Sequence, residues 1–225
     1  YEDFGLLTRD PALGSDLTQL FNYLTGYARD VEYQKLLVAP HTLRPRITEL
    51  VRRVREAAPG TGHVVMKMNS LVDPDMIDEL YAASADGVRV DLIVRGICCL
   101  RPGVEGLSDN ITVRSIVGRY LEHSRIYRFA NGAGVGKPVH YIGSADMMPR
   151  KLDRRVEAVV PIEDPSLQEQ LDEVLSIELT DDQLAWQQLD RSWSRVPPAT
   201  SEGAGGDTHL QLEEDAIKRS EVEMR

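Results

Sequence analysis

The apolar residues of the chain recur at two spacings, one typical of helices and one typical of buried strands. Apolar side chains three or four positions apart predict helices over 15–24, 43–54 and 73–87. Short runs that are continuously apolar, or that alternate apolar with polar, predict strands. The predicted strands are 35–39, 64–69, 88–95, 111–116, 126–129, 139–144 and 154–161. Because strands and helices alternate, the pattern predicts an α/β fold with a parallel sheet covered by helices.

The last third of the sequence predicts helices and then a flexible tail. An aspartate-proline pair at 164–165 is a good helix start, and apolar residues at helical spacing follow it. Thr180 and Gln183 have the spacing of a capping box, which predicts a further helix ending near Trp193. Proline, glycine, serine, threonine and acidic residues then predominate, so we expect a disordered or weakly helical tail over 196–225.

The composition is that of an ordinary globular protein of 225 residues with a formal net charge of −10. No apolar run approaches the length of a membrane span, and no signal peptide opens the chain. The two cysteines, Cys98 and Cys99, are adjacent, so they predict neither a disulfide framework nor a zinc site. These features favour a reducing, cytoplasmic location, with peripheral association with a membrane as the alternative.

Charge is distributed unevenly along the chain. Between residues 114 and 155 there are nine lysines or arginines against three acidic residues. The cations are Arg114, Arg119, Arg125, Arg128, Lys137, Arg150, Lys151, Arg154 and Arg155. Acidic residues instead predominate over 163–190 and over 201–225. Since the local field at a site matters more than the total charge, this pattern predicts a cationic pocket built from the middle of the chain.

The same middle stretch contains one histidine among arginines. His123 lies between Arg119 and Arg125, and we expect residues 118–122 to form one helical turn that presents it. A histidine can act as nucleophile, acid or base near neutral pH, and an arginine fork binds phosphate oxygens in pairs. Arg95 ends a predicted parallel strand, at the edge where ligands of such sheets bind. These residues indicate a phosphate site; the alternatives are a solvated basic corner and, for Arg95, a salt bridge.

Four short motifs resemble those of one enzyme family. They are Val94-Arg95-Gly96-Ile97-Cys98, Ser108-Asp109-Asn110-Ile111, Arg119 to Tyr127 and Gly143-Ser144-Ala145-Asp146. With them, the sequence from Tyr1 to about Leu189 resembles the C-terminal region of polyphosphate kinases of the first type. The resemblance implies a phospholipase D-like mixed or parallel sheet flanked by helices, with C-terminal helices and a flexible tail. It also implies that this sequence is a fragment, since the histidine that these enzymes phosphorylate lies upstream of residue 1.

The resemblance also implies a reaction, its ligands and the residues that bind them. The family transfers the terminal phosphate of ATP reversibly to inorganic polyphosphate through a phosphohistidine. Tyr1, Arg95 and His123 match its ATP and phosphate contacts, and His123 is the catalytic residue of this half of the site. The candidate polyphosphate contacts are Arg125, Arg150 and Arg154. Magnesium is implied as the cofactor, with its ligands upstream of residue 1, so we expect no metal ligand in this chain.

The same resemblance predicts the domain organisation and the partners. Residues 1–30 are expected to be the end of a preceding catalytic domain with a linker helix, 31–195 the C-terminal catalytic domain, and 196–225 a flexible acidic tail. The expected partners are ATP or ADP, inorganic polyphosphate, the upstream domains of the same enzyme and further copies in a homo-oligomer. No nucleic-acid partner and no transmembrane segment are expected. Alone, the fragment is expected to be inactive because the nucleophile is missing.

Two other functions fit parts of the sequence. His123-Ser124-Arg125, followed by Gly143-Ser144-Ala145-Asp146, resembles half of a phospholipase D site, so two copies could pair their halves as a phosphodiesterase. That superfamily has a lysine in place of Arg125 and an asparagine in place of Asp146, and both departures weaken this interpretation. The third alternative is a non-catalytic module that binds polyanions through its basic surface.

Overall fold

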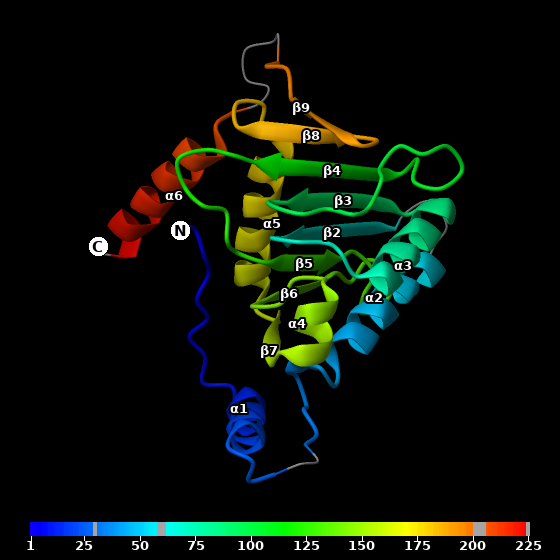
Figure 1. The fold of residues 1–225 in the computed structure, drawn as a ribbon. Coiled ribbons are helices and arrows are strands. Elements are labelled where there is room, and N and C mark those ends of the chain that lie inside the picture. The colour runs from blue at the N-terminus through cyan, green and yellow to red at the C-terminus, as the bar shows by residue number, and fades with distance from the viewer. Residues whose placement is uncertain (29–30, 58–61, 200–205, 224–225) are drawn as a thin grey trace.

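In the part of the chain that the structure describes, nine strands form one mixed sheet, and helices cover both of its faces (Figure 1). This part comprises residues 1–28, 31–57, 62–199 and 206–223 of a computed structural model. The strand order across the sheet is β1-β7-β6-β5-β2-β3-β4-β8-β9. The strands are β1 (Leu37–Ala39), β2 (His63–Met68), β3 (Arg89–Val94), β4 (Ile111–Ile116), β5 (Ile126–Phe129), β6 (Val139–Gly143), β7 (Glu157–Ile162), β8 (Ala185–Leu189) and β9 (Ser192–Arg195). The helices are α1 (Pro11–Leu24), α2 (Leu43–Ala57), α3 (Pro74–Ala85), α4 (Pro149–Arg154), α5 (Pro165–Thr180) and α6 (Thr208–Glu223).

The centre of the sheet is parallel and its flanks are antiparallel. Strand β3 runs parallel to both β2 and β4, whereas β5, β6 and β7 continue the sheet in antiparallel pairs. The segment β2–α3–β3 is therefore the strand–helix–strand crossover that the sequence predicts. The pattern also predicts that the strand over 35–39, the helix over 43–54 and the strand over 64–69 form a parallel strand–helix–strand unit. That prediction is wrong, because β1 pairs antiparallel with β7 at an edge of the sheet and does not pair with β2. The carboxyl ends of β2, β3 and β4 lie together, beside the N-terminus and α6 (Figure 1).

The two faces of the sheet carry separate apolar cores. Helices α2 and α3 cover one face, where Leu50 and Leu80 belong to the same core as Met66 of β2. Helix α5 covers the other face, where Leu175 packs with Val65. Val65 and Met66 are neighbours in the chain and serve opposite cores, as the pleat of a strand requires. Each such buried side chain stabilises the fold by about 1.5–3 kcal/mol. The predicted α/β sheet flanked by helices is confirmed.

One predicted helix, over 180–193, is wrong, because the chain there forms the β8–β9 hairpin and β8 extends the sheet by pairing with β4. Thr180 ends α5, and its Oγ1 donates a 2.8 Å hydrogen bond back to the carbonyl of Ser176, so it caps no new helix. The Asp181 carboxylate instead accepts the backbone N–H groups of 183–185 and turns the chain into β8. Pairing with a distant strand therefore outweighs the local capping signal.

Two shorter elements also differ from their predictions. Residues 118–122 form no helical turn; the segment bends and then pairs through an isolated bridge between Glu122 and Glu2. This pairing holds the segment extended, which the local sequence does not indicate. The strand predicted over 154–161 begins only at β7, because α4 occupies the residues before it and starts with a proline at its first position.

Both ends of the chain contain helices that differ from the predicted ones. Helix α1 begins before the predicted range 15–24, because the Asp10 carboxylate accepts two N–H groups of the first turn and Pro11 follows as the first helical residue. Within the predicted tail, α6 is a helix whose first residues are buried, so the helical alternative holds for this part. Residues 200–205 and 224–225 of the tail lie outside the described residues.

Candidate functional site

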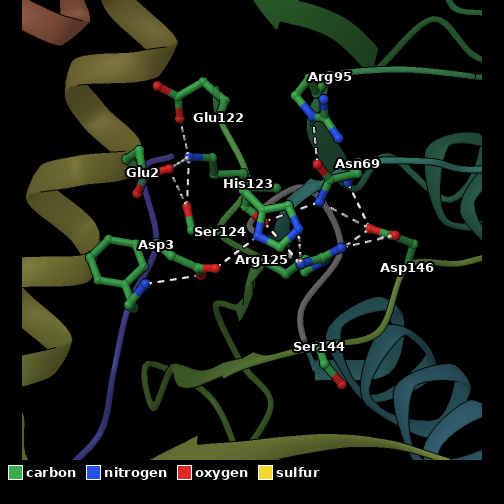
Figure 2. Close-up of polar contacts among 12 residues, drawn as sticks. Glu2, Asp3, Asn69, Arg95, Glu122, His123, Ser124, Arg125, Ser144 and Asp146 are labelled. Carbon is green, nitrogen blue, oxygen red and sulfur yellow. Dashed lines mark hydrogen bonds and ion pairs between the residues drawn. The ribbon is translucent and has the colours of Figure 1, made fainter. Parts of the chain in front are cut away.

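Of the predicted site residues, Tyr1, Arg95, His123 and Arg125 meet where β2 and β3 end, whereas Arg150 and Arg154 lie on α4. Arg95 directly follows β3, and His123 and Arg125 lie in the segment that leads into β5. The first residues of the chain lie alongside that segment: the N–H of Glu2 donates to Leu121 O at 2.9 Å, and the N–H of His123 donates to Glu2 O at 3.2 Å. Figure 2 shows that the side chains of these segments converge around the imidazole of His123.

The imidazole of His123 is held by two residues of the N-terminal segment. Its Nδ1 lies 2.7 Å from Oδ2 of Asp3, and the ring of Tyr1 meets it edge-on with 5.2 Å between ring centroids. Burial would raise the pKa of the Asp3 carboxyl, but hydrogen bonds from His123 and from the N–H of Phe4 outweigh it and lower that pKa. An ionised Asp3 accepts a hydrogen bond from Nδ1–H, which leaves Nε2 as the acceptor nitrogen; Nη1 of Arg125 lies 3.4 Å from it.

A second carboxylate organises the cations on the other side of the imidazole. Arg125 donates from Nε and Nη2 to the two oxygens of Asp146, at 3.1 and 3.2 Å. The same carboxylate lies 2.8 Å from Nζ of Lys151 and accepts the N–H of Asn69 at 2.7 Å. Burial would raise the pKa of Asp146, but these hydrogen bonds lower it. We call these four residues the Asp146 cluster; one of its cations, Lys151, also lies 3.8 Å from Oε1 of the buried Glu157.

Asn69 connects Arg95 to the histidine segment. Its Oδ1 accepts a 2.6 Å hydrogen bond from Nε of Arg95, and its Nδ2 donates to the backbone oxygen of His123 at 3.1 Å (Figure 2). Gly96 makes this approach of β3 to β2 possible, since a Cβ at that position would lie 2.9 Å from Asn69 O. The structure thus brings Arg95 and His123 into one hydrogen-bonded network.

An open pocket of about 330 Å³ lies beside His123 and Arg125. Its other lining residues are Asp3, Phe4, Leu6, Ile142, Gly143, Ser144 and Val160. The Asp146 cluster borders this pocket through Arg125, which is itself buried and therefore fixed in place. A cationic side chain and a half-buried imidazole on one pocket wall suit an anionic ligand whose oxygens accept hydrogen bonds.

Behind His123 lies a second ion cluster, whose members are buried except for the partly exposed Glu2. Nζ of Lys67 donates to Glu178 Oε1 at 2.6 Å, to Ser124 Oγ at 2.7 Å and to Glu2 Oε2 at 3.0 Å, and it also binds Glu122. Burial would lower the pKa of Lys67, but the three carboxylates raise it. Complete burial raises the pKa of Glu178 to about 8. We call these five residues the Lys67 cluster; it has one cation and three carboxyl groups.

Residues 36–204 match the family described as polyphosphate kinase C-terminal domain 2. The chain belongs to this family. A relative named polyphosphate kinase, from Synechocystis, is 55% identical over 205 residues, which are 90% of this chain and 28% of the relative. Another of that name, from Mycobacterium avium, is 53% identical over 200 residues, which are 88% of this chain and 27% of the relative. The chain thus spans less than a third of the length of these relatives.

Solved structures agree with this assignment. The crystal structure of polyphosphate kinase from Porphyromonas gingivalis superposes with a TM-score of 0.88 and 34% identity, covering 96% of this chain and 33% of that one. The phospholipase D family member Nuc from Salmonella typhimurium gives a TM-score of 0.50 and 17% identity over 69% of this chain and 97% of its own. The second likeness concerns the fold alone. The predicted family and its phospholipase D-like fold are confirmed.

The cationic pocket predicted for this polyphosphate kinase domain is wrong in its extent. Of the nine cations between 114 and 155, only Arg125 lines the pocket beside His123. Arg128 donates to Asp172 of α5 at 2.7 Å, and Arg114 donates to the backbone oxygen of Glu178 at 3.0 Å. Arg150 and Arg154 lie on α4 with exposed side chains. Neighbours in sequence therefore point in different directions, because strands and a short helix present successive side chains to opposite faces.

Four residues of the candidate site have structural roles that their sequence pattern does not predict. Asp3 holds His123, Asn69 holds Arg95, Asp146 holds Arg125, and Lys67 anchors the Lys67 cluster. Two of them left a signal: Lys67 is a charged residue inside an apolar strand, and Asn69 is a polar residue where that strand ends. Asp3 left none, because its partner lies 120 positions away in the sequence.

The described residues contain no group of three or more His, Cys, Asp or Glu side chains arranged to hold a metal ion. Both cysteines are free thiols, and burial raises the pKa of Cys98 to about 11. In the ranges that the structure covers, no helix is both long enough and apolar enough to cross a membrane.

Proposed function

We propose that this polyphosphate kinase domain supplies the ATP- and polyphosphate-binding half of the active site for reversible transfer of the terminal phosphate of ATP to inorganic polyphosphate. The observation that carries the proposal is the imidazole of His123, held at Nδ1 by Asp3 at 2.7 Å beside the fixed guanidinium of Arg125 on a pocket wall. An imidazole with one nitrogen fixed and a neighbouring cation suits the oxygens of a phosphoryl group.

In this proposal each residue has one task. Nε2 of His123 hydrogen-bonds to, or exchanges a proton with, the phosphate oxygen that enters or leaves. Arg95, whose position Asn69 fixes, binds the nucleotide phosphates, and Tyr1 contacts the nucleotide beside His123. Arg125 offsets negative charge on the transferred group and contacts the polyphosphate chain. Phosphoryl transfer demands mainly such positioning and cationic cover, with little covalent chemistry from these groups.

The proposal places the nucleophile and the metal outside this chain. The phosphoryl group passes from ATP to a histidine of the upstream part of the enzyme and from there to polyphosphate, so the isolated chain is expected to bind its ligands without turnover. Magnesium is expected to accompany ATP. The carboxylates described here are engaged by lysine, arginine and histidine partners, a donor set that does not fit a magnesium site, so no step is assigned to the ion.

The remaining predictions about this domain stay proposals. We propose that residues 1–30 end a preceding catalytic domain and that 31–195 are the C-terminal catalytic domain. Helix α6, whose first residues pack against this domain, is an exception to the flexible acidic tail predicted over 196–225. We also propose that the enzyme acts in the cytoplasm as a homo-oligomer. The phosphodiesterase alternative is less well supported, because Arg125 stands where that superfamily has a lysine and is engaged in a bidentate pair with Asp146.

The test is isothermal titration calorimetry of this chain with a non-hydrolysable ATP analogue and with long-chain polyphosphate, with and without magnesium. Arg95→Ala and His123→Ala are each expected to weaken binding of the analogue by at least about tenfold, since each removes a contact worth about 1.4 kcal/mol or more. Arg128→Ala is the matched control: it removes a half-buried arginine that pairs with Asp172 away from the site, and affinity should not change.

A different pattern would contradict the proposal. If neither variant weakens binding of the analogue, the pocket beside His123 is not the nucleotide site. If the chain binds only polyphosphate, equally in all variants and with an affinity that collapses in salt, the domain is a non-catalytic polyanion-binding module.

A further inference from the structure

Helix α6 reaches the candidate site although it begins after the end of the family-model match. The match ends at residue 204, and α6 begins at Thr208. Thr208 and His209 are buried, and the N–H of Thr208 donates to Asp181 Oδ2 at 2.7 Å, which ties the start of α6 to the end of α5. Figure 1 shows α6 beside the N-terminus, at the end of the sheet where the site lies.

His209 uses both of its ring nitrogens on the segment that leads to His123. Its Nε2 lies 2.8 Å from Oε1 of Glu122, and its Nδ1 lies 3.3 Å from the backbone nitrogen of Tyr120, which donates to it. The ring therefore carries its proton on Nε2 and donates it to Glu122. The fit is close, because a Cβ on Gly118 would lie 2.7 Å from Nδ1 of the ring.

The contact continues from Glu122 to the residues that hold His123. The other carboxylate oxygen of Glu122 binds Lys67, and Lys67 donates to Glu2 Oε2 at 3.0 Å. Glu2 is the middle residue of the segment Tyr1–Asp3, whose two outer residues contact the His123 ring. The backbone of Glu2 also accepts the N–H of His123. Figure 2 shows Glu122, Glu2 and Ser124 together on one side of the imidazole.

We propose that His209 is a positioning residue for His123: through Glu122, Lys67 and Glu2 it fixes the segment Tyr1–Asp3 and thereby the imidazole. A catalytic effect of His209 rests on the proposed function, whereas its effect on the position of the His123 ring can be measured separately. Glu122 is buried, so it keeps one orientation only while both of its oxygens have partners. Without His209, Oε1 of Glu122 loses its hydrogen-bond donor. The Glu122 side chain can then reorient, which weakens its contact with Lys67 and so the contact of Lys67 with Glu2.

The experiment compares the unmodified chain with His209→Ala and His209→Gln by NMR. The first readout is amide hydrogen exchange of Glu2 and His123, the two N–H groups that join the N-terminal segment to the site. In His209→Ala both are expected to exchange at least about tenfold faster, as expected when a local opening becomes easier. The second readout is the ¹⁵N shift of His123 Nδ1, which should move toward that of a free imidazole. His209→Gln, whose amide can still donate to Glu122, should restore both partly.

The control is His63→Ala, which removes another histidine–carboxylate pair of the same length, 2.8 Å to Asp91, at the opposite end of β2. It should leave both His123 readouts unchanged. If His209→Ala does not fold, Gly118→Ala replaces it as the test, because the added Cβ must displace the imidazole of His209 while the residue itself is kept. Unchanged exchange and an unchanged His123 shift in a folded variant that lacks the His209 contact would overturn the inference.

Binding of the ATP analogue is measured in the same variants, so that the two proposals can fail separately. If the unmodified chain binds the analogue, His209→Ala should weaken it severalfold and His63→Ala should not. If the unmodified chain does not bind, the proposed function is wrong, whereas the exchange and shift measurements still decide whether His209 positions His123.

Discussion

Two ion clusters of different composition lie on either side of His123. In the Asp146 cluster one carboxylate holds two cations, Lys151 also lies 3.8 Å from Glu157, and Arg125 lines an open pocket. The Lys67 cluster has one cation for three carboxyl groups, and of its residues only Glu2 keeps some exposure. The first cluster thus presents a guanidinium to a pocket that an anionic ligand can enter. In the second, carboxyl groups outnumber the cation, and part of the excess is held as a proton.

The pKa directions follow this difference. At the Asp146 cluster, hydrogen bonds from Arg125 and Lys151 outweigh burial and lower the pKa of the carboxyl. At the Lys67 cluster one ammonium cannot offset three charges, and burial raises the pKa of both Glu2 and Glu178. The Asp146 carboxyl is therefore ionised near neutral pH, while Glu178 is largely protonated there. Breaking each cluster should have a correspondingly different effect.

The largest effect is expected from Lys67→Met. This substitution keeps most of the side-chain volume but leaves two buried carboxyl groups, Glu122 and Glu178, and the partly exposed Glu2 without their cation. The loss of one partner of a buried ion pair typically lowers the free energy of unfolding by about 3–5 kcal/mol. Denaturant unfolding followed by circular dichroism measures the change. Lys35→Met is the matched control: Lys35 also pairs with two carboxylates, Asp10 and Glu163, but is partly exposed. Its loss should lower the free energy of unfolding far less, because solvent screens exposed ion pairs.

A smaller effect of Lys67→Met than of Lys35→Met would mean that the Lys67 cluster contributes no more to stability than a surface ion pair. Burial of Lys67 would then not make this cluster the more important of the two for stability.

The next largest effect is a pH dependence that Glu178 introduces. Its pKa is about 8 in the folded protein against an ordinary value of 4.5, so the folded state holds a proton that the unfolded state releases. The stabilisation is complete below the unfolded-state pKa and is lost as pH rises toward 8. At about 1.4 kcal/mol per pKa unit, the free energy of unfolding should fall by a few kcal/mol between about pH 5 and 8. Glu178→Gln, which cannot ionise, should flatten this slope; an unchanged slope would show that the proton resides elsewhere.

A smaller effect is expected at the other cluster from Asp146→Asn. An amide keeps the shape but loses the charge that holds Arg125 and Lys151, and hydrogen bonds to charged groups contribute about 1.5–3 kcal/mol each. Because Arg125 borders the pocket and Lys151 keeps Glu157 at 3.8 Å, we expect a net loss of about 2–3 kcal/mol, smaller than at Lys67. Binding of the ATP analogue should then depend more steeply on salt. A stability loss as large as that of Lys67→Met would show that these remaining partners do not offset the lost charge.

The parts of the fold that follow from local pattern could be predicted from the sequence. In helices α2 and α3 and in strands β2 and β3, the spacing of the apolar residues matches the side that is buried. Because a strand–helix–strand crossover joins parallel strands, the carboxyl ends of β2 and β3 then lie together. The β8–β9 hairpin and the extended segment before His123 could not be predicted, because pairing with β4 and with Glu2 decides them. Partners distant in the chain override a local capping or helical signal.

The candidate site divides in the same way. His123 and Arg125 could be named from their motif, and Arg95 from its place at the end of a strand. The residues that position them could not: Asp3 and His209 reach the histidine segment from opposite ends of the chain. Arg128 and Arg154 show the converse, since their charges fit the predicted pocket but their elements carry them away from it. Sequence reveals the residue types that the chemistry needs, whereas the fold decides which of them meet.

The smallest effects are expected from Arg150→Ala and Arg154→Ala on α4, which extend the comparison from the two clusters to the exposed surface. Both side chains are exposed, so each variant should change the free energy of unfolding by less than about 0.5 kcal/mol and leave binding of the ATP analogue unchanged. If polyphosphate passes over α4, each variant should weaken long-chain polyphosphate binding severalfold and reduce the salt dependence by about one released counterion. Arg119→Ala removes an exposed arginine near Glu213 of α6 instead and serves as the control. An equal loss in all three variants would indicate attraction to overall basic charge, whereas a loss confined to α4 would indicate a defined path leading from the pocket of Arg125.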